Sequence, residues 1–120
     1  MTRILLLIAA MALAPVAAMA EDVVVAEGAV LRGIDRITGE VADIRVMNGD
    51  VVRMGRIMIA LGECRYPSAN PAGEAYAFLA IGEETTIDPI FQGWMVASSP
   101  ALNAMDHRRY DVWVMRCITE

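Results

Sequence analysis

The side chains with chemical potential are concentrated between residues 92 and 114. This stretch contains the only histidine, His107, the adjacent serines Ser98 and Ser99, and two aspartates, Asp106 and Asp111. On paper they supply a nucleophile, a base and a carboxylate, the set that acyl-transfer enzymes use. The pattern is weak, because Asp106 directly precedes His107 and no G-x-S-x-G turn presents either serine. We therefore expect a protein without enzymatic activity.

A soft metal ion such as Cu(I) is a second use for the histidine, together with methionine ligands. After residue 20 the methionines are Met47, Met54, Met58, Met95, Met105 and Met115. They form no M-x-x-M or H-x-M cluster, and methionine in apolar runs usually fills a core. We expect no resident metal or other cofactor, and a carrier of a soft metal or small ligand remains the alternative function.

Residues 98–109 are too many for a plain link between strands, which needs about two to five residues. Pro100 after Ser99 predicts a short helical turn with Ser99 as its N-cap. Long structured loops often carry function. The predicted interaction surface consists of Ser98, Ser99, Asp106, His107, Arg108 and Arg109. The alternative is a lid that buries Leu102 and Met105 over one end of the fold.

Two tryptophans, Trp94 and Trp113, lie within the same stretch. As core residues they would anchor facing strands. As exposed residues they would form an aromatic patch for a ligand or partner. The sequence leaves both interpretations open.

Short apolar runs separated by turn residues predict an all-β fold. Residues 41–47 alternate between apolar and polar side chains, and Asn48-Gly49 after them is a strong hairpin signal. Residues 64–73 are predicted as a loop. Further strands are predicted at 29–34, 51–54, 56–61, 75–81, 90–97 and 110–117. Seven strands and one helical turn indicate a small β-sandwich or barrel over residues 28–120, after a lead-in at 21–27 that serves as a tether.

The N-terminus has the pattern of a cleavable signal peptide over residues 1–20. Arg3 precedes an uncharged apolar run that ends in Ala18-Met19-Ala20, and Glu21-Asp22 follows. The alternative is an uncleaved anchor, for which the run is short, since a spanning helix needs about 20 apolar residues. We expect export to the periplasm, with no membrane span in the mature chain.

The net charge and the cysteine content indicate which classes of binding partner the chain can have. The chain after residue 20 has nine basic and fifteen acidic residues, a net charge of −6. Nucleic-acid binding is disfavoured, because it needs a basic face. The two cysteines, Cys64 and Cys117, indicate a disulfide in an exported domain, with a metal or redox pair as the alternative. Together these features favour a binding or envelope-assembly module whose partner is another periplasmic or envelope protein.

Several short motifs resemble one family of exported proteins. The motifs are Cys64-Arg65-Tyr66-Pro67, Gly93-Trp94-Met95, Ala97-Ser98-Ser99-Pro100-Ala101-Leu102, Asp106-His107 and Tyr110-Asp111-Val112-Trp113-Val114. Over residues 28–117 the chain is similar to the domain of unknown function 2155 family of alphaproteobacteria. The resemblance implies a periplasmic protein in which both cysteines belong to the family pattern, and it implies no activity. One departure is Arg108, where the family pattern suggests proline.

We predict that the mature chain begins at Glu21, because a small-x-small end followed by acids is the pattern that signal peptidase cleaves. The intact mass of protein from the periplasmic fraction measures the position of the cut. Recovery of the full-length chain from the membrane fraction would contradict this prediction.

Overall fold

The computed structural model describes residues 21–119, so the predicted signal peptide, residues 1–20, lies outside the described residues. Eight strands and one 3₁₀ turn make up the fold, which confirms the all-β prediction. The strands are β1 (Val23–Val25), β2 (Gly28–Asp35), β3 (Val41–Met47), β4 (Val51–Met54), β5 (Ile57–Pro67), β6 (Tyr76–Glu83), β7 (Phe91–Val96) and β8 (Tyr110–Ile118), and the turn is η1 (Pro100–Leu102).

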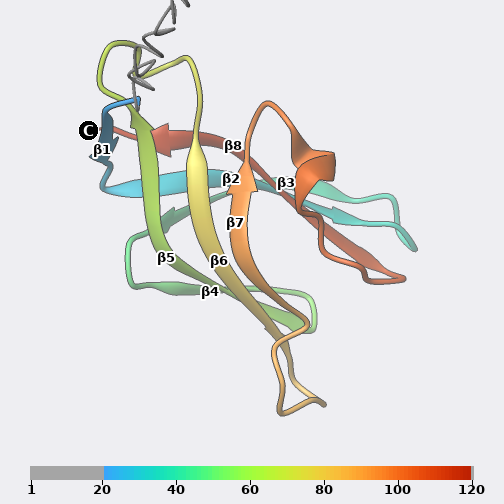
Figure 1. The fold of residues 1–120 in the computed structure, drawn as a ribbon. Coiled ribbons are helices and arrows are strands. Elements are labelled where there is room, and N and C mark those ends of the chain that lie inside the picture. The colour runs from blue at the N-terminus through green and yellow to red at the C-terminus, as the bar shows by residue number, and fades with distance from the viewer. Residues whose placement is uncertain (1–20, 120) are drawn as a thin grey trace, which may run out of the picture.

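The strands form two antiparallel sheets, so of the two expected architectures the sandwich is correct and the closed barrel is not. The larger sheet has the order β1-β5-β6-β7, with β4 also paired to β5, and the smaller sheet has the order β3-β2-β8. In Figure 1 β5, β6 and β7 stand side by side, while β2 and β8 run across behind them. The apolar core lies between the two layers and includes Leu31, Ile59, Leu79 and Val112.

The expected lead-in at residues 21–27 is part of the larger sheet rather than a tether. Val23, Val24 and Val25 pair with Pro67, Tyr66 and Arg65 as strand β1. Ala26 then enters the core, 6% exposed. Three exposed valines beside acidic residues gave too short a pattern to distinguish an edge strand from a flexible segment.

The Asn48-Gly49 turn forms, but it does not make the hairpin that the sequence predicts. Gly49 has a positive φ of 82°, a conformation that glycine adopts without strain. The strands on either side lie in different sheets, because β3 pairs with β2 and β4 pairs with β5. The side chain of Asn48 donates to the carbonyl oxygen of Ala26 at 2.7 Å and holds the crossing point between the layers.

The predicted loop at residues 64–73 is wrong at its start, because β5 continues through a β-bulge to Pro67. Leu61 pairs with Leu79 and Cys64 pairs with Ala77, so β5 spends one more residue than β6 over this interval. The extra residue shifts the alternation of the strand by one. Cys64 therefore faces the core, as Ile59 and Leu61 do before the bulge, and the strand continues to Pro67.

A second bulge lies near the end of β8. Val30 pairs with Arg116 and Leu31 pairs with Val114, which leaves Met115 as the extra residue. The sequence pattern places Cys117 on the face of Trp113, opposite Val114. The bulge reverses this arrangement, and Cys117 is buried, 6% exposed, on the core side.

The two bulges bring Cys64 and Cys117 together in a disulfide, as the sequence predicts. Their Cα atoms are 5.6 Å apart, within the usual range for such a bond. Cys64 is in the larger sheet and Cys117 is in the smaller one. The bond therefore ties the two layers to each other across the core.

Replacing both cysteines by alanine is expected to lower the free energy of unfolding by about 2–5 kcal/mol, because the bond constrains the unfolded chain. Urea denaturation of the oxidised protein and of the Cys64→Ala/Cys117→Ala variant measures the difference. Wild-type protein unfolded with reductant present is the control and should match the variant. Equal midpoints for oxidised wild type and variant would contradict the prediction.

Candidate functional site

The connector, residues 97–109, runs from the end of β7 to the start of β8 and turns back along the free edge of β7. Asn103 Nδ2 donates to the carbonyl oxygen of Trp94 at 2.8 Å, so the connector engages the unpaired edge of this strand. η1 follows Ser99 as predicted, with Pro100 as its first residue. Ser99 does not cap it, because no hydrogen bond from its side chain reaches the turn.

Ser98 is fixed at one end of the connector by Glu74. The Glu74 carboxylate accepts hydrogen bonds from the Ser98 hydroxyl and from the backbone N–H groups of Ser98 and Ala75. Burial raises the pKa of Glu74, but these three hydrogen bonds outweigh burial, and the pKa lies below its ordinary value. The Ser98 hydroxyl is thus held by a carboxylate and not by a histidine.

His107 is fixed at the other end of the connector. Its Nδ1 accepts the backbone N–H groups of Arg109 and Tyr110, both at 3.0 Å. An Nδ1 that accepts two donors carries no proton, so the ring proton lies on Nε2, which is 3.5 Å from Glu83 Oε1. The side chain is only 11% exposed. His107 thus holds the turn that leads into β8.

The structure does not bring the serines and the histidine together. Glu74, which binds Ser98, precedes β6, whereas Glu83 beside His107 is its last residue. At about 3.3 Å per residue, β6 separates these two anchor points by roughly 23 Å. A Ser–His nucleophile needs a hydrogen bond between the two side chains, and this geometry excludes it.

The remaining residues of the predicted interaction surface differ in exposure. Ser98, Asp106 and Arg108 are exposed, whereas Ser99 and Arg109 are partly buried. The lid interpretation holds only in part, because Met105 is buried while Leu102 is 77% exposed. An interaction surface on the connector stays a prediction, and Ser98, Asp106 and Arg108 are the side chains available to it.

Neither tryptophan belongs to the core, which rules out the core interpretation. Trp94 and Trp113 are both 37% exposed. They do not share a patch, because Trp94 lies on the outer side of the larger sheet and Trp113 on the outer side of the smaller one. The Trp113 indole N–H donates to Asp111 Oδ2 at 3.0 Å, which fixes its ring.

Trp94 is the centre of a cluster that we call the aromatic face: Val23, Arg65, Tyr76, Phe78 and Trp94. The rings of Phe78 and Trp94 meet edge to face with centroids 5.4 Å apart. The guanidinium carbon of Arg65 is 4.9 Å from the centroid of the Trp94 ring, a cation–π contact. A mostly apolar hollow of about 260 Å³ lies among Val23, Arg65, Tyr76 and Trp94.

Sequence reasoning found Trp94 but not the rest of the aromatic face. Alternation along residues 75–81 does place Tyr76 and Phe78 on one side of their strand, and that signal was present. Arg65 was missed because the bulge in β5 lies just before it and decides which way it points.

Among residues 21–119, no three His, Cys, Asp or Glu side chains form a group that could hold a metal ion. The same residues include no helix long and apolar enough to cross a membrane.

Comparison with known proteins places the chain in a family. The model of the family described as "Uncharacterized protein conserved in bacteria (DUF2155)" matches residues 29–117. The chain belongs to this family. It is 30% identical over 88 residues to Uncharacterized protein RP359 of Rickettsia prowazekii (strain Madrid E), an alignment that covers 70% of this chain and 56% of the relative. The chain thus spans little more than half the length of that relative. No solved structure is significantly similar to the chain.

Asp35 and Arg109 join the end of the connector to the end of β2. Arg109 Nη2 donates to Asp35 Oδ2 at 2.9 Å and Arg109 Nε to Asp35 Oδ1 at 3.2 Å. The hydrogen bonds from Arg109, helped by the N–H groups of Ile37 and Thr38, lower the pKa of Asp35 to about 2, against the opposing effect of burial. A carboxyl with a depressed pKa stabilises the fold above its unfolded pKa, and this stability is lost as the pH falls through the folded value.

Asp35→Asn is therefore expected to destabilise the domain at pH 7, with a difference from wild type that shrinks as the pH falls from about 4 to about 2. Thermal denaturation across this range measures the difference. Asp88→Asn is the control, because Asp88 is exposed and its carboxyl makes no hydrogen bond within residues 21–119. A difference between Asp35→Asn and wild type that persists at pH 2 would contradict the prediction.

Proposed function

We propose that this protein is a non-enzymatic binding module of the periplasm that docks another envelope protein through the aromatic face. The observation that carries the proposal is the grouping of Trp94, Tyr76 and Arg65 around an apolar hollow on the surface. Trp, Tyr and Arg are the residue types that most often dominate the energy of protein interfaces.

The aromatic face is also built to keep its shape. Trp94 is held on one side by Arg65 and on another by Phe78. A methyl group at Gly62 would lie 3.1 Å from the Phe78 ring, so the bulge that contains Gly62 leaves room for that ring. Rigid side chains lose little conformational entropy on binding, which favours affinity.

The disulfide supports the periplasmic part of this proposal. A bond between the two sheets needs an oxidising compartment to form and persist. The signal-peptide pattern of residues 1–20 points to the same compartment.

Trp94→Ala is expected to weaken binding of the partner by about 2 kcal/mol or more, because an interface hot spot is lost. A photo-cross-linking residue at Gln92, on the same side of β7, would trap the partner in the native host, and mass spectrometry would identify it. The Trp94→Ala chain should lose this cross-linked product.

Trp113→Ala is the matched control, since Trp113 has the same exposure and lies on the opposite sheet. It should retain the product. An unchanged product in Trp94→Ala, or its loss in Trp113→Ala alone, would reject the aromatic face as the docking surface.

A further inference from the structure

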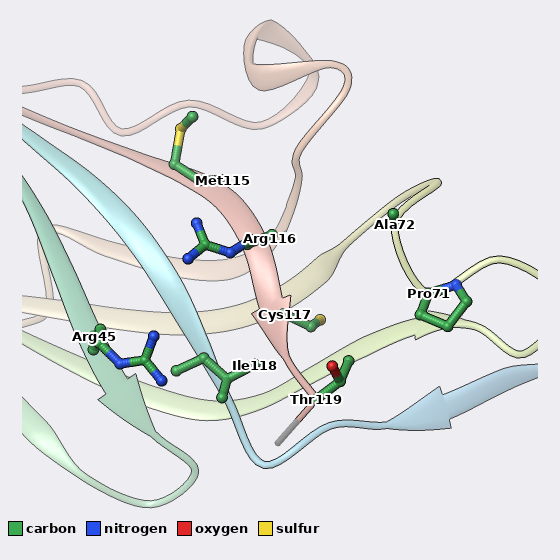
Figure 2. A pocket seen from close by; sticks show the side chains of 8 residues that line it. All are labelled: Arg45, Pro71, Ala72, Met115, Arg116, Cys117, Ile118 and Thr119. Carbon is green, nitrogen blue, oxygen red and sulfur yellow. The ribbon is translucent and has the colours of Figure 1, made fainter.

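The outer side of the smaller sheet carries a pair of arginines that flank one valine. The register places Arg45 of β3 and Arg116 of β8 directly beside Val30 of β2, one on each side. Neighbouring strands are about 4.8 Å apart, so the two arginine Cα atoms are roughly 10 Å apart. Figure 2 shows their guanidinium groups extending toward each other across β2.

Arg45 and Arg116 are both exposed, but the burial of Val30 between them indicates that part of each side chain lies against the sheet. Val30 points to the outside of the sandwich, yet it is only 3% exposed. The long aliphatic stems of the neighbouring arginines are the groups placed to cover it. When the aliphatic stems of Arg45 and Arg116 lie over Val30, their guanidinium groups extend past it into solvent.

Neither guanidinium has a carboxylate within 4.0 Å among the described residues. Five arginines of residues 21–119 have a carboxylate within 4.0 Å, namely Arg32, Arg36, Arg53, Arg65 and Arg109. Asp43 lies on the same face, and its pKa is lowered mainly by the hydrogen bonds from Arg32, with a smaller electrostatic contribution from Arg116. Both of its oxygens already accept hydrogen bonds from Arg32, at 2.8 and 3.2 Å.

The two arginines line a hollow of about 570 Å³ that is open to solvent. Its other walls are Met115, Cys117 and Ile118 of β8, Thr119 directly after that strand, and Pro71 and Ala72 from the loop after β5. A second hollow of about 240 Å³ shares Pro71, Ala72, Met115 and Arg116 and extends the groove to Glu74 and Ser98. Arg45 thus lies at one end of the groove and Glu74 at the other, while Arg116 lines both hollows.

We propose that this hollow binds the phosphate group of a small soluble ligand. Two guanidiniums carry the charge of +2 that a phosphate dianion matches, and each offers a planar fork of donors to its oxygens. An arginine alone is weak evidence, because this chain contains ten arginines and no lysine. Two arginines that line one hollow of an acidic chain, with no carboxylate within 4.0 Å of either, are more specific evidence for an anion site. The same acidity disfavours an anionic membrane surface as the source of the phosphate.

Titration of the oxidised protein with inorganic phosphate at low ionic strength tests the proposal, with NMR signals of the arginine Nε–H groups and of residues 115–119 as the readout. We expect saturable shifts at Arg45 and Arg116. Arg45→Gln and Arg116→Gln should each weaken phosphate binding about tenfold or more. Arg45→Lys, which keeps the charge without the fork, should bind with intermediate affinity and guards against a loss of folding.

Arg56→Gln is the matched control, because Arg56 is exposed and has no carboxylate within 4.0 Å among residues 21–119. It should bind phosphate as wild type does. Shifts that do not saturate, or that are the same in Arg45→Gln and wild type, overturn the site. Equal binding of acetate overturns the preference for phosphate. Binding to phosphatidylglycerol vesicles without binding to inorganic phosphate overturns the soluble ligand. The site is separate from the aromatic face, so these outcomes are independent of the Trp94 experiment.

Discussion

The rest of the structure depends on a covalent bond between two points where β-strands break their alternation. A strand alternates its side chains strictly, so every residue along it is committed to one face unless a bulge intervenes. Cys64 and Cys117 each follow a bulge, and without the extra residue each would point away from the core. The disulfide between the two sheets can therefore form only because both strands contain a bulge, and the bond in turn holds both bulges in place.

The same two bulges direct Arg65 and Arg116, one arginine of each proposed site. Arg65 follows Cys64 and Arg116 precedes Cys117, so a cysteine that points inward has beside it an arginine that points outward. Arg65 reaches Trp94 on one side of the sandwich, and Arg116 reaches the hollow near Arg45 on the other. The disulfide therefore fixes the backbone from which both surfaces are presented. Loss of the bond would loosen the two surfaces together, even though they lie on opposite sheets.

Local patterns in the sequence were enough for the strands but not for their arrangement. Period-two alternation located residues 41–47, and the cysteine count predicted the disulfide. The partners of a strand are decided by contacts distant in sequence, which is why Asn48-Gly49 looked like a hairpin although its flanking strands lie in different sheets. Bulges leave almost no trace in residue types, so Arg65 and the orientation of Cys117 were missed. The aromatic face and the arginine hollow both draw on strands from distant parts of the chain, beyond the reach of any local pattern.

The pairing of β2 with β8 also constrains the order in which this chain folds. Gly28, near the start of the described domain, pairs with Ile118, near its end. When a chain emerges with its N-terminus first, β2 is available early, while β8, one of its two partner strands, is still missing. Contacts between such distant segments form slowly, because a long loop must close before they contribute. The smaller sheet is therefore incomplete until the last strand is available, and the two layers cannot close over the core before almost the whole domain is present.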